Sequence, residues 1–263
     1  MVDRRAAGLP LEHVLGWAEF CGLRIAVDPG VFVPRRRTEF LVGLAADLAR
    51  EAAGPASETA SPAGQPSALA CEAASPAGPV LARPRTVVVD LCCGSGAMGA
   101  ALAAALGQAE LHAVDIDPAA VRCARRNIAA AGGHEHEGDL YEPLPATLRG
   151  RVDVLLANVP YVPTKEIELL PAEARLYEPR VALDGGADGL DILRRVTAAA
   201  PLWLAPGGHL LFETSERQAP EAAGIVARDG LIPRVVRSGK LNATVVIGTR
   251  PGNGNHHARS SPL

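Results

Sequence analysis

From residue 85 onward, short apolar runs alternate with stretches of helical periodicity. Apolar runs rich in β-branched residues predict buried strands, and the amphipathic stretches between them predict helices. The expected strands cover residues 86–93, 111–117, a short part of 134–142, 152–157 and 208–214, with a final pair centred near Val235 and Val246. The expected helices cover residues 97–106, 119–131, 189–204 and 216–228. This alternation predicts an α/β fold with a doubly wound sheet, which binds ligands beyond the carboxyl ends of its strands.

The first 50 residues predict a short appendage to this sheet. Residues 13–22 are partly helical, and residues 23–33 are typical of a hairpin that turns at residues 28–30. Thr38 resembles the N-cap of a helix over residues 39–50. We therefore expect an N-terminal helix and hairpin segment over residues 1–50.

The segment 51–84 separates this appendage from the main domain. It consists mostly of Ala, Pro, Gly and Ser with few large apolar side chains. Such a segment cannot bury enough surface to offset the entropy lost on ordering, so it predicts a flexible linker. The main domain is expected over residues 85–250, followed by a disordered tail over residues 251–263.

Composition narrows the class of protein. The net charge is −3, so the chain has no overall positive charge that would attract nucleic acid or a membrane surface. No apolar run reaches membrane-spanning length and the first residues lack the apolar core of a secretory signal, so we expect a cytoplasmic protein and no membrane partner. The five cysteines form no C-x-x-C pair, which argues against a disulfide framework or a metal site.

A glycine-rich turn follows the first strand of the main domain. Gly94, Ser95 and Gly96 begin a G-x-G-x-x-G pattern, and Asp115 lies 115 − 94 = 21 residues after Gly94, at the end of the next strand. Glycines there let the backbone approach a ligand, and the acid accepts hydrogen bonds from ribose hydroxyls. The pattern alone suits a nicotinamide cofactor, a flavin or S-adenosylmethionine (SAM).

Further residues favour SAM. The carboxylate of Asp90, just before the turn, would attract the positively charged amino acid part of SAM. It would repel the pyrophosphate of a dinucleotide cofactor. Asp139 can accept from an adenine amino group, and we group Leu140 beside it with the cofactor-binding residues; the alternative for Asp139 is an exposed loop acid.

The strand over residues 152–157 runs into Asn158, Val159, Pro160 and Tyr161. The side-chain oxygen of Asn158 and the backbone oxygen of Val159 can both accept hydrogen bonds from a planar NH2 group. Pro160 restricts Val159 to extended geometry, and the Tyr161 ring can lie flat on an amide or base. The tetrapeptide predicts a site that methylates such a nitrogen, although an Asn-Pro turn is the alternative for these residues taken alone.

These motifs resemble those of the HemK/PrmC family of protein-(glutamine-N(5)) methyltransferases. The resemblance covers residues 31–42, 90–103, 113–127 and 156–195, in the family's order. It implies a Rossmann-like class I SAM-dependent methyltransferase fold and methyl transfer to a glutamine amide in a protein substrate, such as a release factor or another translation protein. It also implies that Asn158 to Tyr161 are catalytic and that Cys92, in the cofactor loop, contacts SAM.

The chain departs from the family pattern at three places. Val159 replaces the first proline of the usual Asn-Pro-Pro-Tyr, and Cys92 with Cys93 replaces the usual Gly-Thr. Only 30 residues precede Val31, whereas release factor methyltransferases of the family carry a sizeable helical N-terminal domain. The chain therefore resembles a divergent subgroup whose substrate need not be a release factor.

Three other functions fit parts of the pattern. Methylation of an exocyclic amine of DNA or RNA would use the same acceptor pair, but the acidic charge and the lack of a basic recognition module argue against it. A nicotinamide-dependent oxidoreductase and a non-catalytic SAM-binding protein are the others.

Two loops remain. Arg35, Arg36 and Arg37 are interpreted as a solvated loop, with a contact to a carboxylate as the alternative. Residues 178–191, rich in Asp and Gly, are interpreted as a loop that shapes the substrate side of the site.

Overall fold

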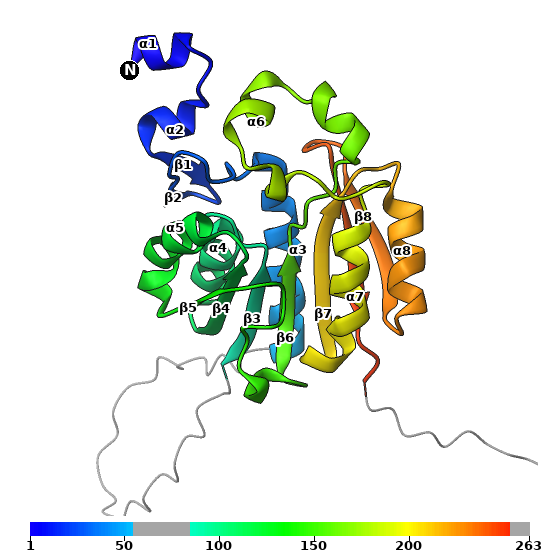
Figure 1. Ribbon diagram of the computed structural model, residues 1–263. Helices are drawn as coiled ribbons and strands as arrows, with labels where there is room; N and C mark the ends of the chain where they lie inside the picture. Colours follow the sequence, from blue (N-terminus) through cyan, green and yellow to red (C-terminus); the bar gives the residue numbers. More distant parts are fainter. Residues whose placement is uncertain (55–84, 253–263) are drawn as a thin grey trace, which may run out of the picture.

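The computed structural model describes residues 1–54 and 85–252 of the 263-residue chain (Figure 1). Residues 55–84 of the expected linker and residues 253–263 of the expected tail lie outside the described residues, so both interpretations remain predictions.

Seven strands form one sheet in the order β5-β4-β3-β6-β7-β9-β8. They are β3 (Thr86–Leu91), β4 (Ala109–Asp115), β5 (His134–Glu137), β6 (Val152–Ala157), β7 (Leu204–Thr214), β8 (Ile232–Ser238) and β9 (Ala243–Thr249). Strands β3 to β7 are parallel, and β9 is antiparallel to both β7 and β8. The strand order reverses between β3 and β6, which is the switch point beside which doubly wound folds bind ligands. The predicted fold class is therefore confirmed.

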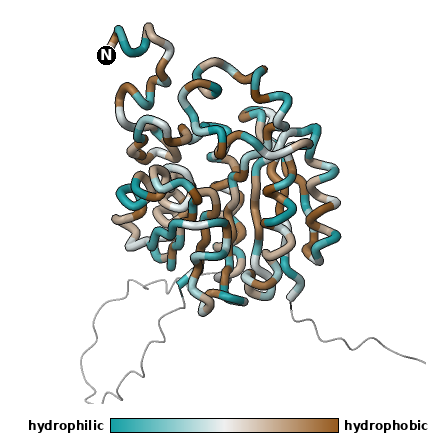
Figure 2. Tube along the Cα trace, viewed as in Figure 1, coloured by the Kyte–Doolittle hydropathy of each residue, from teal (hydrophilic) through white to brown (hydrophobic). Residues whose placement is uncertain are grey.

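Helices cover both faces of the sheet (Figure 1). On one face lie α3 (Glu39–Ala53), α4 (Ala97–Leu106) and α5 (Pro118–Ile128); on the other lie α7 (Asp191–Trp203) and α8 (Ala219–Arg228). Because successive strand residues point to opposite faces, Val88 packs in the first core cluster while Val87 and Val89 pack in the second. Burial on both faces explains why the strands are continuous apolar runs (Figure 2).

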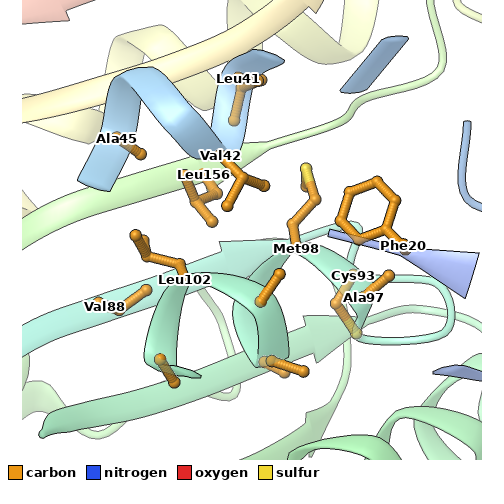
Figure 3. Close-up of a cluster of buried hydrophobic side chains, with 14 of the residues drawn as sticks. Phe20, Leu41, Val42, Ala45, Val88, Cys93, Ala97, Met98, Leu102 and Leu156 are labelled. Carbon is orange, nitrogen blue, oxygen red and sulfur yellow. The ribbon is translucent and has the colours of Figure 1, made fainter. Parts of the chain in front are cut away.

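The first core cluster joins the N-terminal segment to the sheet. Figure 3 shows Phe20 beside Met98 and Cys93, with Leu41 and Val42 of α3 above them. Phe20 and Leu41 are fully buried. The N-terminal segment is therefore packed into the main core.

That segment consists of α1 (Val2–Ala6), α2 (Leu11–Leu15) and a hairpin of β1 (Trp17–Phe20) and β2 (Leu23–Ala26). The predicted hairpin turn at residues 28–30 is wrong, because the strands lie earlier and turn at Cys21 and Gly22. Both residues have positive φ, 50° and 74°, which a two-residue type I′ turn requires. Asp28 does begin a turn, closed by the Val31 N–H on its carbonyl at 3.1 Å, but residues 31–35, which follow it, form no strand.

The connection from β6 to α7 is irregular and lies at the carboxyl ends of the parallel strands (Figure 1). It contains η4 (Thr164–Leu169), α6 (Ala172–Tyr177) and η5 (Arg180–Ala182); the other short turns are η1 (Arg36–Thr38), η2 (Ala129–Ala131) and η3 (Ala146–Leu148). Among the helices in residues 1–54 and 85–252, none has the length and apolar composition needed to cross a membrane.

The glycine turn before α4 allows two helices to approach closely. Gly96 has φ 75°, and a Cβ there would lie 3.0 Å from the Cβ and 3.1 Å from the Cα of Ala124 in α5. Gly107, at the other end of α4, also has φ 75°, but a Cβ there would meet nothing within 4 Å. The two positions share the positive φ, whereas ψ is 16° at Gly96 and −39° at Gly107, and their surroundings differ.

We predict that Gly107→Ala lowers the free energy of unfolding by about 1–2 kcal/mol, the cost of a positive φ for a residue with a side chain. Gly96→Ala should cost about 1–3 kcal/mol more, because α5 has to shift. Urea denaturation of the two variants measures both values. Equal losses would show that the approach of α4 to α5 does not depend on Gly96.

Candidate active site

A cavity of about 500 Å³ opens at the carboxyl ends of β3, β4 and β6. Its volume is within the range of roughly 300–1,000 Å³ that is usual for small-molecule sites. The expected site residues that line it are Cys92, Gly94, Ser95, Asp115, Asp139, Leu140, Asn158, Val159, Pro160 and Tyr161. Two others do not line it: Gly96 packs against α5, and Asp90 lies inside β3. The structure thus brings residues from two distant motifs to one cavity.

The Asn158 side chain lies where β6 ends. Its Oδ1 atom is buried and has no hydrogen-bond partner among the described residues. A buried acceptor without a partner costs about 1–3 kcal/mol, so such an atom is suited to a donor that a ligand supplies. Val159 beside it is 2% exposed and also lines the cavity.

The segment after α6 holds the backbone of this loop from outside the cavity. Val162 and Asp184 form a parallel bridge, and the Gly185 N–H donates to the Val162 carbonyl at 2.9 Å. A Cβ on Gly189 would lie 2.3 Å from the Tyr161 carbonyl oxygen, so only glycine fits there. Gln218 Nε2 donates to the same carbonyl at 3.0 Å. These contacts fix the direction in which the loop enters the cavity.

Asp115 fixes the glycine turn. Its Oδ2 accepts from the Gly94 N–H at 2.8 Å, and its Oδ1 accepts from the Asp117 N–H at 2.9 Å. Burial raises the pKa of Asp115 above its usual value. Cys92, between this turn and β3, has φ 53°, a left-handed conformation that is strained for a residue with a side chain.

Asp90 is fully buried. Its Oδ2 accepts from the Gly99 N–H at 2.8 Å, while its Oδ1 has no partner among the described residues. Burial raises the pKa of Asp90 to about 8, since loss of water disfavours the charged form. The carboxyl group therefore supports the start of α4 from within the sheet.

Asp139 follows β5 and forms an ion pair with Arg195 of α7 at 2.6 Å. Leu140 next to it is buried, with φ 51°. Asp139 is therefore held at the cavity wall by a partner on α7.

Two arginines near the N-terminus contact buried carboxylates. Arg35 donates to Glu178 Oε2 and Arg37 Nε donates to Glu213 Oε1, both at 2.6 Å, while Arg36 is exposed. The solvated-loop interpretation is wrong for Arg35 and Arg37, and the alternative, a contact to a carboxylate, is confirmed. Both acids are buried, so each needs a cationic partner.

Glu213 also binds Thr38 and Tyr161. Thr38 is the N-cap residue of α3, as predicted, but its hydroxyl donates to Glu213 Oε2 at 2.8 Å and makes no capping hydrogen bond. The Tyr161 hydroxyl donates to Glu213 Oε1 at 3.1 Å. Burial, and then the Glu213 charge, raises the pKa of Tyr161 to about 12, so the phenol stays protonated. The sequence did contain a signal for Glu213, because it is the only acid in the apolar strand over residues 204–214.

Comparisons with known proteins agree with this geometry. Residues 79–186 match the family model of the methyltransferase small domain. The release factor glutamine methyltransferase of Geobacter sulfurreducens is 36% identical over 96% of this chain and 77% of its own length. That of Streptomyces coelicolor is 34% identical over 87% of this chain and 71% of its own length.

Solved structures show the same fold at low identity. The ribosomal protein L11 methylase of Lactobacillus delbrueckii subsp. bulgaricus has a TM-score of 0.53 and 16% identity, over 86% of this chain and 85% of that one. The 16S rRNA N2 G1207 methyltransferase of T. Thermophilus has a TM-score of 0.54 and 17% identity, over 89% of this chain and 49% of that one.

The sheet, the glycine turn and the matched domain define a Rossmann-like class I methyltransferase. The chain belongs to the family of release factor glutamine methyltransferases, the HemK/PrmC family, as its motifs indicated. Methylation of a base amine is not favoured by these relatives.

The buried Asp90 predicts a dependence of stability on pH. Its pKa is raised on folding from 3.8 to about 8, so it stabilises the fold while protonated, and this contribution is lost as pH rises through about 8. Between about pH 5.5 and pH 8.5, the wild type should therefore lose at least ~1 kcal/mol more than Asp90→Asn, which keeps the acceptor for Gly99. Urea denaturation at both pH values measures this difference.

Asp47→Asn is the control, since it makes the same substitution at an aspartate that is exposed on α3. Its pH dependence should follow the wild type. If Asp90→Asn follows the wild type as well, Asp90 is ionised at neutral pH in the folded protein.

Proposed function

We propose that this protein transfers the methyl group of SAM to the side-chain amide nitrogen of a glutamine in a protein substrate. The observation that carries the proposal is the buried Oδ1 of Asn158 at the wall of the cavity, which has no hydrogen-bond partner within residues 1–54 and 85–252. It offers an acceptor to one N–H of the amide, and the Val159 carbonyl offers an acceptor to the other. The family of the chain supports the same reaction.

The loop acts by positioning. An amide nitrogen is a poor nucleophile because its lone pair is delocalised into the carbonyl group. Two fixed acceptors, from Asn158 and Val159, hold the NH2 plane and aim the nitrogen at the incoming methyl group. Pro160 keeps Val159 extended, which directs its carbonyl. In the reaction a C–N bond forms, the bond from methyl to sulfur breaks, and the nitrogen loses one proton.

The remaining cavity residues fit SAM, which supplies an electrophilic methyl group when bound. Asp115 already accepts two backbone N–H bonds, but a carboxylate has about four acceptor positions, so ribose hydroxyls can still bind it. We propose that the backbone of Cys92, Gly94 and Ser95 lies against SAM, while Gly96, which packs against α5, holds the turn in place. Asp90 behind the turn, with its pKa raised to about 8, supports the start of α4 through the Gly99 N–H, and we assign Asp139 with Leu140 to the adenine end.

The proposed substrate is a release factor, because the relatives carry that activity in their names. Another translation protein is the alternative for a divergent subgroup. Either substrate places the activity in the cytoplasm.

We predict that Asn158→Ala lowers methyl transfer to a purified bacterial release factor at least about a hundredfold, because the amide loses a positioning acceptor. Label from radioactive SAM, located by mass spectrometry on one glutamine, measures the transfer. SAM affinity by calorimetry and the free energy of unfolding should stay close to wild type, since removing an unpartnered atom breaks no internal hydrogen bond.

Full activity of Asn158→Ala would contradict the assignment of this residue. Label that enters a different translation protein from a lysate would replace the substrate but keep the reaction. Transfer of label to nucleic acid, together with binding that weakens as the salt concentration rises, would contradict the proposed reaction.

A further inference from the structure

Three side chains form a closed hydrogen-bonded group at the rim of the cavity. Arg37 donates through Nε to Glu213 Oε1 at 2.6 Å and through Nη2 to the Tyr161 hydroxyl. The Tyr161 hydroxyl donates to the same Glu213 oxygen at 3.1 Å. We call these three residues the tyrosine anchor.

The anchor joins three separate parts of the chain. Arg37 belongs to η1, ahead of α3; Glu213 lies near the end of β7; and Tyr161 follows β6. Gln218 holds the backbone carbonyl of Tyr161. The two ends of this residue are therefore fixed by different segments, and the orientation of its ring is determined between them.

Neutralising a buried acid does not require the contact with Tyr161. Glu213 Oε2 accepts from Thr38 and Oε1 accepts from Arg37 Nε, so both oxygens have partners without the phenol. The bond from Arg37 Nη2 to the Tyr161 hydroxyl is additional and acts on a residue of the cavity wall.

Arg35 provides the comparison within the same loop. It also lines the cavity and also pairs with a buried acid, Glu178, at 2.6 Å. Its guanidinium group lies over the Phe32 ring, 4.7 Å from the centroid. No hydrogen bond from Arg35 to Tyr161 is present in the described part of the chain.

We propose that Arg37 and Glu213 are positioning residues for methyl transfer, which hold the Tyr161 ring as one wall of the slot where Asn158 receives the amide. This proposal rests on the proposed function. Without the anchor, the ring can rotate about its side-chain bonds, and the amide loses the surface that keeps its plane in line with the methyl group. A misplacement of about 1 Å can lower a rate by roughly a hundredfold.

The kinetic test compares Arg37→Gln, Tyr161→Phe and the double variant. Each single change should lower kcat roughly tenfold or more, with a smaller change in KM for the release factor and with SAM affinity within about twofold of wild type. The double variant should be no slower than the slower single variant, because both changes remove one anchor. Multiplied losses would overturn the proposal.

Arg35→Gln is the matched control. Combined with Tyr161→Phe, its effect on kcat should multiply, since Arg35 does not act through the phenol. Arg37→Lys keeps the charge but cannot reach both partners with the planar fork of arginine, so it should recover only part of kcat. Full recovery by lysine would show that charge alone suffices and would overturn a role in orientation.

A second measurement does not depend on turnover. The chain contains three tyrosines, so ring resonances of 13C-labelled Tyr161 can be assigned by comparison with Tyr161→Phe. Arg37→Gln should change the shift of the Tyr161 ring and speed its flipping, while Arg35→Gln should leave both as in wild type. An unchanged Tyr161 ring in Arg37→Gln would overturn the anchor.

The two measurements separate the two proposals. If the wild type methylates no glutamine, the proposed function fails, and the ring resonances still decide whether Arg37 fixes Tyr161. If glutamine is methylated and the ring is unaffected by Arg37→Gln, the anchor fails and the proposed function stands.

Discussion

Parallel strands that end at one edge are the constraint on which the site depends. The last backbone groups of β3, β4 and β6 have no further partner in the sheet, so turns and side chains have to supply one. Asp115 does so for the Gly94 N–H, and the segment around Gly185 does so for the loop at Val162. The groups that close the sheet are thereby the groups that shape the cavity. The same residues therefore complete the backbone hydrogen bonds of the sheet and form the binding site.

Three buried acids at the same edge are accommodated in different ways. Glu178 has Arg35 and the Val33 N–H, and Glu213 has Arg37 and its hydroxyl donors. Asp90 has a backbone donor and, in the described part of the chain, no cationic partner, and burial raises its pKa. The Arg37–Glu213 pair ties the N-terminal segment to β7, and the Arg35–Glu178 pair ties it to the connection from β6 to α7, so that segment is a wall of the cavity as well as a part of the core.

The features found from sequence are those that local residues determine. Strands, helices and the two motifs depend on neighbours in the chain, and the pairing of Val235 with Val246 was expected for that reason. The pairing of Arg37 with Glu213 joins residues 176 positions apart and depends on which strand lies beside which, so periodicity could not reveal it. The turn at Cys21 was missed because cysteine rarely adopts positive φ, whereas Asp28-Pro29-Gly30 carries a stronger turn signal.

The course of α3 has a practical consequence. Its last turn lies beside the end of α4, where Arg50 donates to the Ala105 carbonyl at 3.0 Å, and β3 begins at the same edge of the sheet, opposite the cavity (Figure 1). The chain therefore leaves at Gly54 and re-enters at Arg85 far from the site. The free energy of closing such a connection grows only with the logarithm of its length. A reporter domain or affinity handle inserted there would leave the geometry of the cavity unchanged.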